Sequence, residues 1–91
     1  MMSKYIYVYL GNDMEGAAQA KRYAEEHSIT RAEFYQAKQA SLKPSLMVEV
    51  RNESYSNEKY LWYKKQDGDR YRIIRTHKTP DGKTELYCER I

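Results

Sequence analysis

The sequence predicts a small α+β domain in which two short helices pack on one face of a largely antiparallel sheet. Three observations support this fold class. Residues 5–10 alternate strictly between tyrosine and aliphatic side chains, two helix-start signals follow, and the second half of the chain consists of short alternating segments separated by turn residues. The predicted element order is β-α-α-β-β-β-β. A length of 91 residues suffices for one hydrophobic core, so we expect a single domain over residues 1–91.

The first predicted strand covers residues 5–10, with the sequence YIYVYL. Alternate side chains of a strand point to opposite faces. One face would therefore carry Ile6, Val8 and Leu10, and the other Tyr5, Tyr7 and Tyr9. We expect the aliphatic face to join the core and the tyrosines to be displayed outside.

Two helices are predicted next. Asn12 followed by Glu15 resembles a capping box, which predicts a helix over residues 12–26 with an alanine-rich inner stripe. Thr30 and Glu33 form a second capping box, flanked by apolar residues placed as in a hydrophobic staple, and predict a helix over residues 31–41.

The rest of the chain is predicted to be β. Residues 46–51, 59–66, 70–77 and 84–91 have the alternation of strands. Asp67-Gly68 indicates a two-residue hairpin, and residues 80–82 (Pro-Asp-Gly) indicate a further turn. Residues 52–58 form a polar connection.

Motifs for enzymatic or metal chemistry are absent from the sequence. His27 and His77 have no ligand spacing between them, so no metal site is expected. Cys88 is the single cysteine, which excludes an intramolecular disulfide, and its position beside Leu86 predicts an inert, inward-facing thiol. The four glycines build no phosphate-binding pattern. We therefore expect no cofactor and no enzymatic activity.

The predicted cellular location rests on the lack of membrane-spanning and secretory patterns in the sequence. The longest apolar run is too short to span a bilayer, and the N-terminus lacks the pattern of a secretory signal. A cytoplasmic protein without membrane contact is the expectation. The oligomeric state stays open.

Composition favours a protein-binding domain that acts by occupying a surface. Ten of the 91 residues are tyrosine, the net charge is only +3, and tyrosine, tryptophan and arginine dominate interface hot spots. In size and composition the chain is similar to phage-encoded inhibitors of host machines, anti-CRISPR proteins among them. The candidate contact residues are Tyr5, Tyr7, Tyr9, Arg51, Lys64, Lys65, Arg70, Arg72 and Arg75.

Nucleic-acid binding is the first alternative. Residues 19–38 are similar to the helix-turn-helix pattern, which implies that Arg31, Tyr35, Gln36 and Gln39 would face the major groove. Residues 64–78 form a basic hairpin, with six basic residues against two acids.

A small ribonuclease toxin is the second alternative. The element order and the basic strands resemble the layout of toxins of the RelE type. That resemblance would place functional groups among Arg51, Arg72, Arg75, Tyr87 and Arg90.

Overall fold

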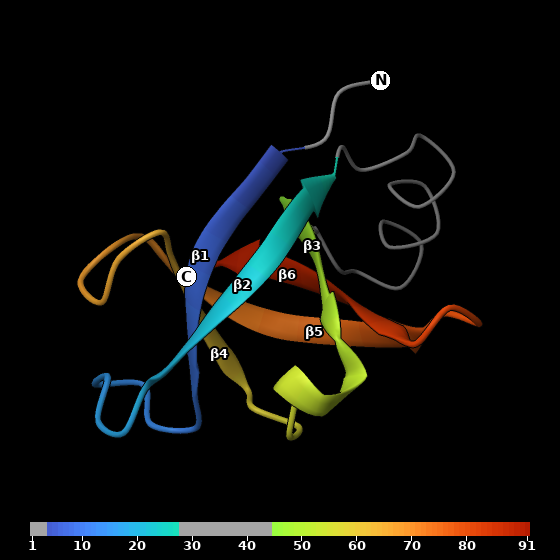
Figure 1. Cartoon of the computed structure of the whole chain (residues 1–91). Helices are drawn as coiled ribbons and strands as arrows, with labels where there is room; N and C mark the ends of the chain where they lie inside the picture. Colours follow the sequence, from blue (N-terminus) through green and yellow to red (C-terminus); the bar gives the residue numbers. More distant parts are fainter. Residues whose placement is uncertain (1–3, 28–44) are drawn as a thin grey trace.

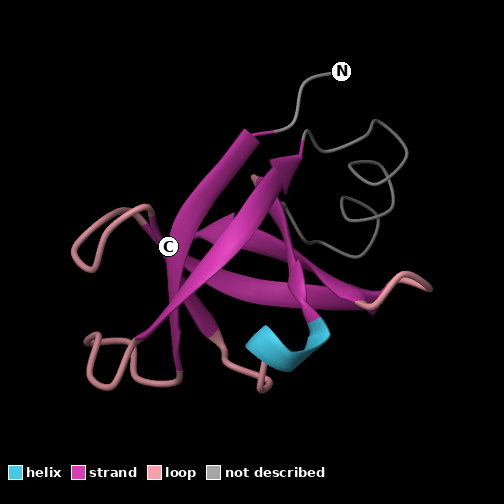
Figure 2. Ribbon diagram, in the orientation of Figure 1, coloured by secondary structure: helices cyan, strands magenta, loops and turns pink. Residues whose placement is uncertain are grey.

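A computed structural model of the chain describes residues 4–27 and 45–91, and it shows a closed six-stranded barrel rather than an open sheet covered by helices. The elements appear in Figures 1 and 2. They are β1 (Lys4–Gly11), β2 (Ala20–His27), β3 (Leu46–Arg51), the short 3-10 helix η1 (Asn52–Ser54), β4 (Tyr60–Tyr63), β5 (Arg70–Lys78) and β6 (Lys83–Arg90).

The barrel consists of two three-stranded meanders. β1, β2 and β3 are neighbours in that order, and so are β4, β5 and β6. The meanders are joined by antiparallel pairing of β1 with β4 and of β3 with β6, which closes the barrel. In Figure 1 the hairpin of β1 and β2 crosses β5 and β6 at a steep angle, as tilted strands on opposite walls of a barrel must.

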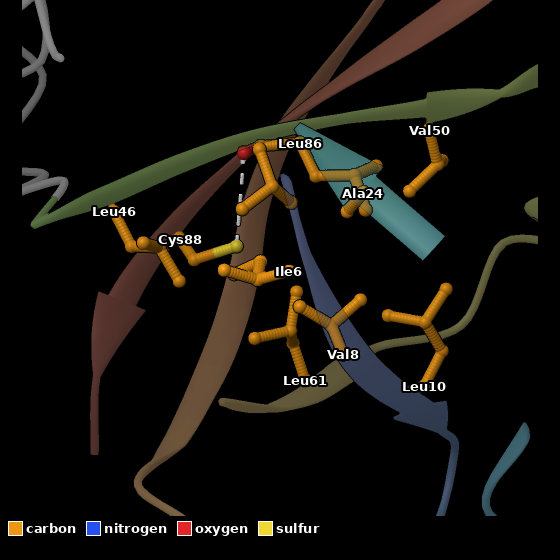
Figure 3. Close-up of a cluster of buried hydrophobic side chains, with 10 residues drawn as sticks. Ile6, Val8, Leu10, Ala24, Leu46, Val50, Leu61, Leu86 and Cys88 are labelled. Carbon is orange, nitrogen blue, oxygen red and sulfur yellow. Dashed lines mark hydrogen bonds between the residues drawn. The ribbon is translucent and has the colours of Figure 1, made fainter. Parts of the chain in front are cut away.

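The core lies inside the barrel and is aliphatic. Val8, Val48 and Leu86 are fully buried, and every strand contributes inward side chains to the same cluster or packs against it. Figure 3 shows these side chains converging, with the Cys88 thiol directed at the Leu86 carbonyl oxygen at 3.8 Å. The predicted inward placement of Ile6, Val8 and Leu10 is confirmed.

The α+β prediction is wrong. The predicted helix over residues 12–26 is instead a loop followed by β2, whose residues pair with β1 from Ala20 opposite Leu10 to Glu26 opposite Lys4. Among the described residues the only helical segment is η1. The second predicted helix, over residues 31–41, lies outside the described residues.

Asn12 does not cap a helix but makes a contact to a distant segment of the chain. The Asn12 side-chain oxygen accepts a hydrogen bond from the Lys59 backbone amide at 3.2 Å, which ties the loop to the segment before β4. Asp13 instead takes the amides of Glu15 and Ala17, at 3.0 and 3.3 Å, in a turn. Gly16 and Ala18 then adopt positive φ, at 93° and 57°, which ends any helical course.

The later strands follow the predictions closely, with one exception at the hairpin. β3 has the predicted bounds, β5 and β6 differ from theirs by one residue, and the turn at 80–82 connects them. β4, however, ends at Tyr63, so residues 64–69 form a longer loop than the two-residue hairpin predicted at Asp67-Gly68. Gly68 is required there because an added Cβ would lie 2.1 Å from the Tyr63 carbonyl oxygen.

No helix within residues 4–27 or 45–91 is long and apolar enough to cross a membrane.

Leu61→Ala should destabilise the domain by about 2–5 kcal/mol, because a fully buried side chain of the strand that closes the barrel would leave a cavity. Chemical denaturation followed by tryptophan fluorescence measures the change. Lys65→Ala, on the exposed loop, is the control and should shift stability by less than about 0.5 kcal/mol. Equal stability of the two variants would contradict a core centred on the barrel interior.

Candidate functional site

Three exposed tyrosines lie side by side on the outer surface of β1 and β2. Tyr7 is directly opposite Tyr23 in the strand register, with ring centroids 5.4 Å apart, and Tyr5 stacks on Tyr23 at 5.5 Å with an interplanar angle of 8°. The exposed fractions of Tyr5, Tyr7 and Tyr23 are 60%, 49% and 57%. We call these three residues the tyrosine face.

The tyrosine face is bordered by a cation. The Lys21 ammonium lies 4.3 Å from the centre of the Tyr7 ring, within the range of a cation–π interaction. Tyr9, the third predicted tyrosine, is only half exposed, because its register neighbours are Lys21 on β2 and the buried Trp62 on β4. The exposed face therefore gains Tyr23 and loses much of Tyr9 relative to the prediction.

A groove of about 220 Å³ adjoins the tyrosine face where β2 and β3 diverge. Within the described residues the two strands pair through Glu25–His27, and Arg22 donates a 3.0 Å hydrogen bond to the Ser54 carbonyl beyond the end of β3. Buried Ala24 and Val50 line the gap between them. The remaining lining residues are Tyr5, Tyr23, Glu25, Glu49, Arg51 and Lys83.

One end of the groove holds a cluster of metal-ligating side chains: Glu25, His27 and Glu49. His27 Nε2 lies 3.6 Å from a Glu25 carboxylate oxygen and 3.4 Å from one of Glu49. Lys83 approaches the same Glu49 oxygen at 3.8 Å. The chemistry of this donor set suits a cation.

A second hollow of about 360 Å³ lies beside the loop after β1. Its acidic lining residues are committed within the molecule, since Asp13 accepts two loop amides and Glu58 accepts the Ser56 amide at 2.7 Å. We assign no ligand to it.

The predicted basic residues are largely engaged by intramolecular partners. Arg72 forms an ion pair with Glu89, and Arg70 donates to the Met14 carbonyl at 2.9 Å. Arg75 lies over the ring of buried Tyr87, at 4.3 Å from its centre. Lys64 and Lys65 are exposed on the loop after β4. Arg51, at the end of β3, lines the groove. Arg51 is therefore the predicted basic residue that shares the groove with Tyr5 and Tyr23.

Only some of the residues proposed for the nucleic-acid-binding and toxin alternatives lie within the described part of the chain. Arg31, Tyr35, Gln36 and Gln39 lie outside the described residues. Residues 20–27, which the helix-turn-helix interpretation needs as a first helix, form β2 instead. The toxin-like layout depended on the same helix. Of its proposed residues, Arg90 pairs with Asp69 at 3.0 Å and Tyr87 is buried.

Cys88 is buried as predicted and faces the core. Burial raises the pKa of its thiol, so the reactive thiolate is disfavoured. His77 lies on the outer surface, 3.1 Å from Glu85, whereas the register partner of Cys88 on β5 is inward-facing Ile73. Cys88 and His77 therefore lie on opposite faces of the sheet.

Sequence reasoning missed Tyr23, Glu25, His27 and Glu49 as parts of one site. The signal that could have found the first three is the alternation of outward residues along β2, which the helix prediction hid. No protein-family model, no curated protein and no solved structure matches this chain.

The hydroxyl of Tyr63 donates a 2.5 Å hydrogen bond to Glu26. Burial, and then this bond, raise the pKa of Tyr63 above its ordinary value of 10.0. Because the folded pKa is the higher one, the associated stability is complete below pH 10 and is lost as pH rises toward the folded value.

Tyr63→Phe should therefore flatten the alkaline fall in stability. We expect the variant to be destabilised by about 1 kcal/mol at neutral pH through loss of the hydrogen bond, and to lose less stability than wild type between pH 10 and 12. Thermal denaturation across this pH range measures both effects. Parallel pH curves for the two proteins would show that the Tyr63–Glu26 contact carries no pH dependence.

Proposed function

We propose that this chain is a non-enzymatic protein-binding domain that acts by occupying a surface of its partner, with the tyrosine face as the centre of the contact. The observation that carries the proposal is the side-by-side exposure of Tyr5, Tyr7 and Tyr23 at 60%, 49% and 57%. Contiguous exposed aromatic surface is unusual on a small monomer and is typical of interaction sites.

The arrangement of the rings suits protein recognition. Tyrosine supplies large contact area with only two side-chain torsions, so little conformational entropy is lost on binding. Stacking of Tyr5 on Tyr23 already restricts these rings in the unbound domain, which lowers that cost further. Lys21, Arg51 and Lys83 stand around the rings as polar rim groups.

The balance of charges favours protein over nucleic acid as the partner. A phosphate backbone needs several cations that are available to it. Here Arg72 and Arg90 are paired with Glu89 and Asp69, so a phosphate would compete with carboxylates already in place. On the tyrosine face itself, Lys21 is the cation in cation–π contact with a ring.

The barrel suits an inhibitor that works by occupation. Closure pairs the strands around the barrel, so the domain offers few open edges for unspecific pairing. A small domain with an exposed aromatic surface can cover a functional surface of a larger protein complex without catalysing a reaction. A phage-type inhibitor, such as an anti-CRISPR protein, is one form of this function.

Single-stranded nucleic acid is the second candidate, and one observation favours it. Three exposed rings flanked by lysine form a platform on which bases can stack without sequence preference. Such binding would be lost on nuclease treatment and would weaken strongly with salt.

The double variant Tyr7→Ala/Tyr23→Ala should weaken partner binding by at least about 30-fold, because each ring removes contact area at the centre of the interface. The immobilised domain is incubated with host lysate at physiological salt, with and without nuclease treatment, and the retained proteins are identified. Affinity is then measured with the purified partner. Variants of the β5–β6 side, His77→Ala/Lys78→Ala, are the matched control and should bind as wild type does.

Circular dichroism distinguishes lost binding from lost folding, since both tyrosines are exposed and the double variant should keep its β spectrum. Binding that survives the tyrosine changes would move the interface elsewhere. Binding that disappears after nuclease treatment would favour the nucleic-acid candidate. So would binding that is lost on adding salt when no protein is retained.

A further inference from the structure

Two glutamates of like charge face each other across neighbouring strands. Glu25 on β2 is the direct register partner of Glu49 on β3, and the two side chains are only 15% and 12% exposed. Like charges in directly opposed positions destabilise a sheet, and burial increases the repulsion. The pair therefore calls for a positive charge between the two carboxylates.

His27 points its Nε2 atom into the position between these carboxylates. It is two residues from Glu25 on the same strand, so both side chains lie on the outer face of β2. His27 Nε2 is shielded from solvent and makes no hydrogen bond within the described structure. A buried ring nitrogen without a hydrogen bond is a strong candidate for a metal ligand, because a neutral imidazole nitrogen offers its lone pair.

The two distances from His27 to the glutamates match the separation of ligands around one metal ion. Zinc binds histidine nitrogen and carboxylate oxygen at about 2.0–2.2 Å, so two ligands at a tetrahedral angle are about 3.4 Å apart. His27 Nε2 lies 3.4 and 3.6 Å from the two carboxylates. The three ligand atoms all lie within 4.8 Å of one another.

We propose that Glu25, His27 and Glu49 bind a divalent transition-metal ion, with Zn²⁺ as the best match. The imidazole ligand distinguishes this class from Mg²⁺ and Ca²⁺, which prefer all-oxygen sites. Three protein ligands leave at least one coordination position open. Because Glu25 and Glu49 also line the groove beside Tyr5, that position would be reached from the groove.

Lys83 opposes this binding. Its ammonium lies 3.8 Å from the Glu49 oxygen that also faces His27, so the metal must displace it or share the carboxylate with it. Removing the charge should therefore strengthen metal binding. In a purely structural ion-pair network, by contrast, Lys83 would be one of the groups that neutralise the glutamates, so removing it would lower stability and produce no zinc response.

Thermal denaturation of the tag-free protein with added ZnCl₂ tests the proposal. At zinc concentrations about tenfold above the midpoint of the titration, the melting temperature of wild type should rise by about 5–10 °C. His27→Asn should abolish the rise. His77→Asn is the matched control, because His77 also contacts a glutamate, Glu85, but has a single carboxylate within ion-pair distance among the described residues.

Two further variants keep the test independent of folding defects. Glu25→Gln removes the repulsion between the glutamates, so it should stabilise the metal-free protein while losing the zinc response. Lys83→Met should lower the zinc concentration at the midpoint severalfold. Competition with a chromophoric chelator measures the stoichiometry, which should be one ion per chain.

The proposal is overturned if wild type shows no rise with Zn²⁺, Co²⁺ or Ni²⁺, or if His77→Asn loses as much of the response as His27→Asn. It is also overturned if Glu25→Gln keeps the full zinc response. None of these outcomes depends on the tyrosine face, so partner binding and metal binding can fail separately.

Discussion

Closure of the barrel is the constraint on which the other features depend. Pairing of β1 with β4 and of β3 with β6 leaves one register in which Val8, Val48 and Leu86 all point inward. A shift of one residue in any strand would turn its aliphatic side chains to water and its polar ones to the core. The same register that buries the core therefore also sets which side chains stand outside, and it places Tyr7 beside Tyr23 and Glu25 beside Glu49.

Some sequence predictions succeeded because their signal is local. Strict alternation in residues 5–10 and 46–51 located β1 and β3 and assigned their inner faces correctly, since a strand that is buried on one side shows this period in its own residues. The prediction of exposed Tyr5 and Tyr7 followed directly. The turn at residues 80–82 was likewise readable from its Pro-Asp-Gly sequence.

The wrong predictions concern residues whose structure depends on contacts with distant parts of the chain. Residues 20–27, AKRYAEEH, are rich in good helix formers, and their pairing with β1 and β3 makes them a strand. Tyr23 was missed for this reason, as were Glu25 and His27, because residues two apart share a face on a strand but not on a helix. Glu49 could not be joined to them, since the sequence does not show that β2 and β3 are neighbours.

The tyrosine face and the Glu25–His27–Glu49 cluster meet at a single register pair, Tyr5 opposite Glu25. A cation held by the cluster would change the charge beside Tyr5, while Tyr7 stands opposite Tyr23, one pair further along the same face. Coulomb interactions weaken with distance and with solvent exposure, so an effect of metal on partner binding would be concentrated at Tyr5. Because β2 and β3 are already paired at Glu25 and Glu49, such coupling requires a change of charge but no movement of the strands. Metal and partner would then influence each other reciprocally through the groove that residues of both sites line.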